Sequence, residues 1–241
     1  MRTIWTLASL ALLAACATND TDDAADTTAA AATDTTAMAG AMDDDPDRAT
    51  GGGGVPSGYL GQVDPPRPGR TPASISGAQY TAANNRWEVR TGPAHIVYAA
   101  KDTASGNFTA SVQMEQLENP AHPEAFGIFV GGQNLDQAEQ QRYTYFLVRG
   151  GGEIMVRVRE GTSTRDVIAW RPAEGIPRAD ASGKASYELG VQVAGDSVRF
   201  LVNDREVASV PKASLPTDGV VGMRINHNLH VMVAPVEITR G

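Results

Sequence analysis

The sequence YTYFLVRGGGEIMVRVR at residues 143–159 decides the fold class of this chain. Two runs rich in aromatic and β-branched side chains flank three glycines, which is typical of two antiparallel strands joined by a turn. Side chains alternate between the two faces of each strand, so Phe146 and Val156 lie on one face, which is predicted to point into the core. The other face pairs Tyr143 with Arg159, Tyr145 with Arg157, and Arg149 with Glu153.

Ten further short runs of apolar or alternating character follow the same pattern. They recur at roughly ten-residue spacing with Gly, Asn, Asp or Pro between them, which predicts an all-β chain folded as an antiparallel sandwich or barrel. With the first two, they give about 12 strands. The ten runs are residues 87–90, 95–99, 108–117, 125–130, 166–170, 187–193, 197–202, 206–210, 220–225 and 229–238.

A second turn can be placed at Asn203-Asp204, a pair that suits a two-residue hairpin loop. This turn predicts Val202 opposite Arg205 and Phe200 opposite Val207. Residues 135–142 are the best helical candidate, but they lack an apolar face, so we expect a short turn in a loop.

The first sixteen residues have the anatomy of a secretory signal. The basic Arg2 precedes an apolar run, residues 7–15, that is too short to span a bilayer. The run ends LAAC at 13–16, which resembles the lipobox of bacterial lipoproteins. The resemblance implies cleavage before Cys16, acylation of its thiol and amine, and anchoring in a membrane. An ordinary secretory signal with a chance Cys is the alternative.

The residues after Cys16 predict a tether. Ala17 rather than Asp follows the Cys, and the resemblance to lipoproteins then implies sorting to the outer membrane, with its periplasmic or surface face left open. Residues 17–56 are mostly Ala, Thr, Asp and Gly without an aromatic residue, so they cannot bury enough surface to fold. The chain therefore divides into a signal peptide (1–15), a disordered tether (16–56) and a folded domain (57–241).

Charge and cysteine content exclude several classes of function. Lys and Arg total 20 against 28 for Asp and Glu, and the tether holds nine of the Asp. The folded domain is left near neutral, without the basic surface that nucleic-acid binding requires. Since Cys16 is the one cysteine, the chain has no intramolecular disulfide and no cysteine-based zinc site.

The closing third of the chain resembles a known superfamily. The stretches LGVQV at 189–193, GDSVRFLVN at 195–203 and DGVVGMR at 218–224 resemble the concanavalin A-like lectins and glucanases, laminin-G-like modules included. The resemblance implies a jelly-roll β-sandwich over most of 85–241. Asp204 and Met223 stand where that family has Gly and Leu. Among bacterial members the chain is loosely similar to the 3-keto-disaccharide hydrolase group, which implies no catalytic residue here.

The residues themselves give no convincing catalytic or metal constellation, and no cofactor is predicted. Glu115 and Glu118 are the nearest acid pair, but a spacing of three puts them on opposite faces of a strand, unlike a glycosidase pair. His227 and His230 are split in the same way. Three consecutive glycines at 150–152 form a hairpin turn rather than a phosphate loop.

What remains is a recognition surface. Tyr and Arg on one hairpin face suit sugar binding, since aromatic rings stack on sugars and Arg pairs with hydroxyls; an ordinary solvent-facing sheet is the alternative. We predict a lipid-anchored protein that binds carbohydrate, with a glycan-cleaving hydrolase and a structural envelope protein as alternatives. The candidate ligand-binding residues are Tyr143, Tyr145, Arg149, Arg157, Arg159, Trp170, His122, Glu124, Asn134, Arg224, Asn226, His227 and Asn228.

Overall fold

Alternation of apolar and polar side chains along short runs folds the described part of this chain into strands with almost no helix. The computed structural model describes residues 53–66 and 71–241, so the predicted signal peptide, Cys16 and most of the predicted tether lie outside the described residues. The described part belongs to the second of two units, Met42–Gly241; the first unit, Met1–Ala41, lies outside it. No helix in the described part is long and apolar enough to cross a bilayer.

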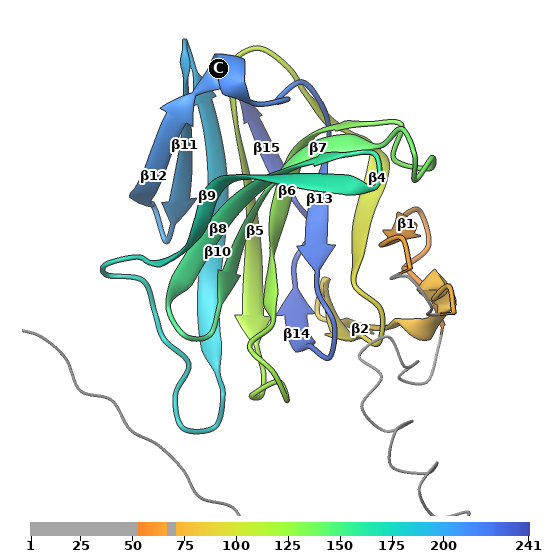
Figure 1. Ribbon diagram of the computed structural model, residues 1–241. Coiled ribbons are helices and arrows are strands. Elements are labelled where there is room, and N and C mark those ends of the chain that lie inside the picture. The colour runs from red at the N-terminus through yellow and green to blue at the C-terminus, as the bar shows by residue number, and fades with distance from the viewer. Residues whose placement is uncertain (1–52, 67–70) are drawn as a thin grey trace, which may run out of the picture. The chain divides into compact units, whose positions relative to one another are not determined.

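Two antiparallel sheets form the sandwich shown in Figure 1. The first is a seven-stranded sheet of order β1 (Leu60–Val63), β4 (His95–Ala104), β13 (Gly219–Ile225), β6 (Ala125–Gln133), β7 (Arg142–Arg149), β8 (Glu153–Glu160) and β9 (Ser163–Pro172). Strands far apart in sequence are neighbours here, since β13 lies between β4 and β6. The predicted all-β sandwich is confirmed.

The second sheet has eight strands. Its order is β12 (Arg205–Pro211), β11 (Ser197–Val202), β10 (Ala185–Ala194), β5 (Phe108–Gln116), β14 (His230–Val233), β3 (Arg86–Arg90) and β2 (Gln79–Ala83), and β15 (Glu237–Arg240) also pairs with β5. Two 3₁₀ turns, η2 (Ile75–Gly77) and η3 (Lys212–Ser214), are the helical elements of the described residues.

Three strand predictions needed correction. The sequence patterns did not predict β1 or β2, although Asn84 and Asn85, both at positive φ, form the tight turn that joins β2 to β3. The predicted strand 229–238 is two strands. Pro235 interrupts it because proline has no N–H to donate to a ladder.

One of the two predicted hairpin registers is confirmed, and the other is wrong at one pair. Strands β7 and β8 pair as predicted, with Tyr145 opposite Arg157 and Phe146 opposite Val156. In the hairpin β11–β12, Val202 pairs with Arg205 as predicted, but Phe200 pairs with Ala208, so the prediction of Val207 was wrong. A bulge between Phe200 and Leu201 shifts the register by one residue.

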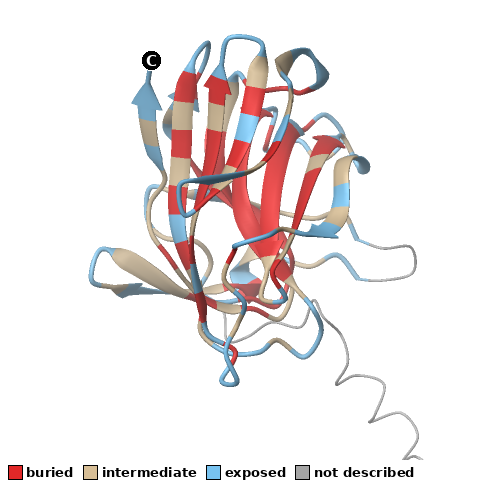
Figure 2. Ribbon diagram, turned by 90° about the vertical axis from the view of Figure 1, so that its left-hand side faces the viewer, coloured by how far each residue is buried: buried red, intermediate tan, exposed pale blue. Residues whose placement is uncertain are grey.

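The space between the sheets is the main core, and buried residues follow the strands that enclose it (Figure 2). Phe146 and Val156 lie there, fully buried. A second apolar cluster covers the other face of the seven-stranded sheet, and it includes Tyr143 and Tyr145, which are 1% and 4% exposed. The face that the sequence presented as open is therefore largely covered.

The folded domain starts slightly before the predicted boundary at residue 57. The backbone N–H of Gly54 donates to the carbonyl oxygen of Ala78 at 3.1 Å, and Val55 packs against the main core. Gly54 and Val55 therefore contact the folded strands.

Candidate functional site

A pocket of about 510 Å³ opens on the outer face of the seven-stranded sheet. Three arginines line it, and we call it the arginine pocket. Its residues come from four places: the hairpin β7–β8 with the start of β9, the end of β13 and the residues after it, the Pro-rich segment that follows β1, and the loop before β4. The lining residues are Asp64, Pro65, Pro66, Ala73, Pro93, Ala94, Tyr145, Leu147, Met155, Arg157, Arg159, Thr162, Thr164, Arg224, Asn226 and His227.

A row of paired residues crosses the sheet at the pocket. Arg224 on β13 pairs with Gly127 on β6, Gly127 pairs with Leu147 on β7, and Leu147 pairs with Met155 on β8. Three of these four residues, Arg224, Leu147 and Met155, line the pocket. A Cβ atom at Gly127 would lie 2.0 Å from the carbonyl oxygen of Phe146, so only glycine fits at this point of the row.

Asp64 binds two of the arginines at once. Its carboxylate accepts hydrogen bonds from Nη1 and Nη2 of Arg224 at 2.6 and 2.5 Å, and from Nη2 of Arg159 at 3.0 Å. Strand β1 pairs with β4 up to Val63, and the N–H of Asp64 then donates to the carbonyl oxygen of Ala94 at 3.0 Å. The backbone thus fixes Asp64 where both guanidinium groups reach it.

The arginines are also held from their other sides. Nε of Arg224 donates to Oδ1 of Asn226 at 3.2 Å, and Nη1 of Arg159 donates to the carbonyl oxygen of Thr162 at 3.1 Å. Arg159 and Arg224 are 6% and 5% exposed, so both arginine side chains of the cluster are largely buried. Charge-assisted bonds of this kind fix both position and orientation.

Asp64 and Arg224 keep each other charged. Burial raises the pKa of the Asp64 carboxyl, but the guanidinium groups of Arg224 and Arg159 outweigh burial and hold that pKa below its ordinary value. Burial likewise lowers the pKa of Arg224, and the charge and hydrogen bonds of Asp64 raise it above its ordinary value. The cluster therefore carries two positive charges and one negative charge at neutral pH.

The opposite wall of the pocket carries a second pair. Arg157 on β8 donates hydrogen bonds to Asp166 on β9, and it lies opposite Tyr145 in the sheet. Those hydrogen bonds raise the pKa of Arg157, against the effect of burial. The guanidinium of Arg224 lies 5.9 Å from the Tyr145 ring centroid. Tyr145 thus stands between two arginines that are each paired with a carboxylate.

A buried histidine supports the edge of this site. The hydroxyl of Tyr80 lies 2.6 Å from Nε2 of His95, and Nδ1 of His95 lies 2.8 Å from the carbonyl oxygen of Pro93. A carbonyl only accepts, so Nδ1 carries the proton and the Tyr80 hydroxyl donates to Nε2. Burial lowers the pKa of His95 to about 4. His95 therefore stays neutral and holds Pro93, which lines the pocket.

This histidine predicts a pH dependence of stability. Its pKa in the folded domain, about 4, lies below the ordinary 6.5, so between these values the unfolded chain binds a proton that the folded chain excludes. The contribution of neutral His95 to the free energy of unfolding is fully present above pH 6.5. The free energy of unfolding falls as the pH is lowered, by about 3 kcal/mol at pH 4. Urea unfolding at several pH values measures the loss. His95→Gln should remove most of this loss of stability at low pH, whereas His122→Ala, which changes an exposed histidine, should not.

The other predicted site residues lie in several different places. Arg149, His122 and Glu124 line a neighbouring cavity of about 400 Å³, which we call the Glu124 cavity. Tyr143 is buried beside Tyr145 without lining either space. Trp170 is half-buried, with the guanidinium of Arg149 at 4.3 Å from its ring centroid.

Two predicted residues lie in turns away from both spaces. Asn134 is exposed after β6, and Asn228 lies between β13 and β14; both have positive φ. Their backbone conformation accounts for asparagine there, since asparagine tolerates the left-handed region. The sequence patterns also missed Asp64, whose two partners lie 95 and 160 residues away. No local pattern identifies such partners.

The acid pair Glu115 and Glu118 lies elsewhere. Glu115 is on β5 of the eight-stranded sheet and lines a shallow cavity of about 270 Å³ with Arg86 and Glu188. Glu118 forms an ion pair with Arg90 at 3.4 Å, and its carboxylate lies 3.3 Å from Nδ1 of His230. Neither carboxylate lines the arginine pocket. In the part of the chain that the structure describes, no group of three or more His, Cys, Asp or Glu is arranged to hold a metal ion.

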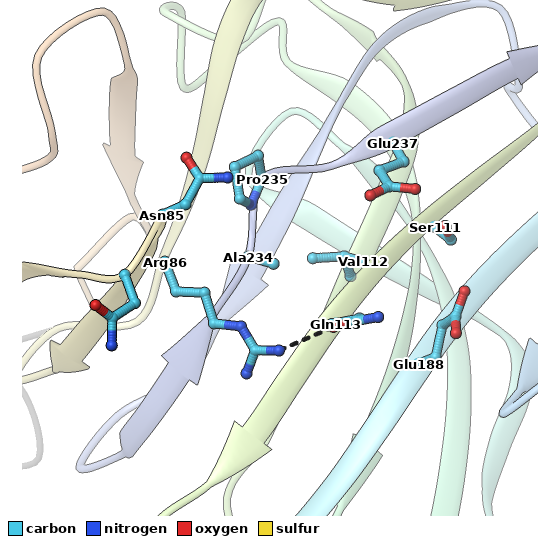
Figure 3. A pocket seen from close by; sticks show the side chains of 10 residues that line it. Asn85, Arg86, Ser111, Val112, Gln113, Glu188, Ala234, Pro235 and Glu237 are labelled. Carbon is cyan, nitrogen blue, oxygen red and sulfur yellow. Dashed lines mark hydrogen bonds between the residues drawn. The ribbon is translucent and has the colours of Figure 1, made fainter.

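A further cavity of about 270 Å³ lies on the outer face of the eight-stranded sheet (Figure 3). Arg86 reaches across it and donates to Gln113 at 3.0 Å, while Glu188 and Glu237 stand on its far side. Its lining includes no aromatic ring and no buried charged side chain. The arginine pocket is larger and more rigidly built, so we take the arginine pocket as the candidate site.

Comparisons with known proteins identify the fold. No family model and no curated protein matches the chain. Among solved structures, the carbohydrate binding module CBM66 from Bacillus subtilis has a TM-score of 0.54 at 11% identity, covering 75% of this chain and 94% of that one. A Bacillus subtilis protein of unknown function with a galectin-like fold has a TM-score of 0.55 at 10% identity, covering 76% and 89%. The described domain therefore has a lectin-like β-sandwich fold.

Proposed function

We propose that the arginine pocket binds a carbohydrate. The observation that carries the proposal is the fixed cluster of Asp64, Arg159 and Arg224 beside the ring of Tyr145. A ligand meets donors and acceptors that are already oriented, so binding costs little side-chain entropy. The pocket volume lies within the range of small-ligand sites.

The lining matches the chemistry of a sugar. Hydroxyl groups both donate and accept, and the pocket presents guanidinium donors, the Asp64 carboxylate and the Asn226 amide. Leu147 and Met155 add an apolar floor for the C–H surface of a sugar ring. The carboxylates of Asp64 and Asp166 offset two of the three arginine charges, so a ligand needs hydroxyl groups rather than several negative charges to pair with the pocket.

The fold is compatible with this function. The Bacillus subtilis module of similar fold is described as carbohydrate-binding, and at 11% identity the likeness concerns fold alone. The proposal therefore depends on the pocket of this chain.

A glycan array with the purified full chain tests the proposal. Arg157→Gln should weaken retention of the bound glycans by roughly 10- to 100-fold, since a hydrogen bond to a charged group contributes about 1.5 to 3 kcal/mol. Tyr145→Phe, which keeps the buried ring, tests the hydroxyl. Arg142→Ala is the matched control because Arg142 lies on the same hairpin, is exposed and pairs with Glu160 at 3.8 Å.

Other outcomes would favour the alternatives. Retention by Arg157→Gln equal to that of the native chain would place the site elsewhere. Release of reducing ends during incubation would indicate a glycan-cleaving hydrolase. Retention of no glycan at all would favour a structural envelope protein.

We also propose that Cys16 carries a lipid anchor that holds the domain at the outer membrane. The LAAC sequence at 13–16 supports it. Cys16→Ser should leave an unprocessed precursor without lipid, because the thiol accepts the first lipid before cleavage. Metabolic labelling with palmitate measures this, and label that persists in Cys16→Ser would contradict the anchor.

A further inference from the structure

The Glu124 cavity adjoins the arginine pocket along the hairpin β7–β8. The pocket includes the opposed pair Leu147 and Met155, and the next pair on the same face, Arg149 and Glu153, lines the Glu124 cavity. Residues two apart on a strand are separated by roughly 6.6 Å. Two successive residue pairs on the same face of the hairpin β7–β8 therefore line the two spaces, one pair in each.

A hydrogen-bonded chain joins the two spaces at a second point. Asn226, in the pocket, accepts from Nε of Arg224 at 3.2 Å and hydrogen-bonds to the Glu124 side chain. The N–H of Asn226 also donates to the carbonyl oxygen of Ala125, the residue after Glu124, at 3.0 Å. The rim of one space is thus tied directly to the rim of the other.

The Glu124 cavity offers groups of the same kind as the pocket. Arg149 and Glu153 are paired at 2.6 Å, and the His122 imidazole and the Asn119 amide line the space beside them. Its floor includes Gln116, which is 1% exposed and donates from Nε2 to the carbonyl oxygen of Gly183 at 2.6 Å. This is a second polar space with paired charges, within the size range of a ligand site.

We propose that the two spaces form one groove that binds a carbohydrate chain, with sugar units in the arginine pocket and further units in the Glu124 cavity. From the level of Arg159 to that of Glu153 the groove follows six residues of strand, roughly 20 Å. This exceeds what one sugar unit fills. The proposal rests on the carbohydrate-binding function proposed above and assigns an oligosaccharide or polysaccharide as its ligand.

Titration calorimetry with oligosaccharides of increasing length tests the groove. The probes are malto-, cello-, laminari- and inulo-oligosaccharides of two and of five units, titrated into the full chain. In a series that binds, the five-unit chain should bind at least tenfold more tightly than the two-unit chain. Arg157→Gln should weaken both lengths.

Variants in the Glu124 cavity then separate the two spaces. His122→Ala and Glu153→Gln should each weaken the five-unit chain severalfold and leave the two-unit affinity unchanged. Glu160→Gln is the matched control, since Glu160 ends the same strand as Glu153 but is exposed and lines neither space.

The outcomes distinguish this inference from the proposed function. Equal affinity for both lengths, unaffected by His122→Ala and Glu153→Gln, would overturn the groove and leave the pocket as a binding site. Binding of neither length in any series, together with an empty glycan array, would overturn the proposed function itself.

Discussion

Replacing Asp64 by Ala should lower the free energy of unfolding by about 3 to 5 kcal/mol, because it leaves two buried guanidinium groups without their counter-charge. Arg159 and Arg224 are 6% and 5% exposed, so their guanidinium groups stay largely buried when the carboxylate is removed. Urea unfolding at pH 7 measures the loss. We expect a lower midpoint with an unchanged dependence on denaturant.

The matched control is Asp166→Ala. Asp166 also pairs with an arginine of the pocket, but its side chain is 47% exposed, and such surface pairs contribute at most about 1 kcal/mol. An Asp64→Ala loss no greater than that of Asp166→Ala would show that water reaches the Asp64 cluster.

Acid should have a related effect on the native chain. The pKa of Asp64 in the folded domain lies below its ordinary value of 3.8. The stabilisation by its ion pairs is therefore present above pH 3.8 and is lost as the pH falls through the lower, folded value. Asp64→Asn should lack this part of the acid transition.

The two-faced hairpin was predictable because strand geometry is local. Side chains alternate along a strand, and the three glycines fix the turn, so the sequence alone places Tyr145 opposite Arg157. Arg224, Asn226 and His227 also reach the pocket as predicted neighbours. What alternation cannot tell is what packs against each face.

The cover over Tyr143 and Tyr145 shows that limit. A polar-looking face with Leu147 and Met155 among its residues is half apolar, and residues of other strands, such as Ile96 on β4, complete a second cluster there. The apolar pair Leu147 and Met155 was the sequence signal for this cover. No sequence signal indicated Asp64, since it binds partners that only the completed sheet brings near. The bulge at Phe200 is also invisible in the sequence, since either register keeps the turn at Asn203.

The core face of the same hairpin should respond most strongly to truncation. Phe146→Ala should lower the free energy of unfolding by about 3 to 5 kcal/mol, because the site cannot collapse around the lost ring. Phe146 is 0% exposed, and its ring centroid lies 5.2 Å from that of Phe200 on the opposing sheet. The variant thus leaves a cavity between the two sheets and also loses an aromatic pair.

Phe146→Leu separates these two losses. Leucine fills most of the space, so its cost should be less than half that of Phe146→Ala, and glycan retention should persist because the pocket lies on the other face of the sheet. Urea unfolding of both variants, with the glycan array as a second readout, gives the comparison. A loss below about 1 kcal/mol for Phe146→Ala would mean that the two faces are assigned the wrong way round, since only an exposed position tolerates removal of the ring so easily.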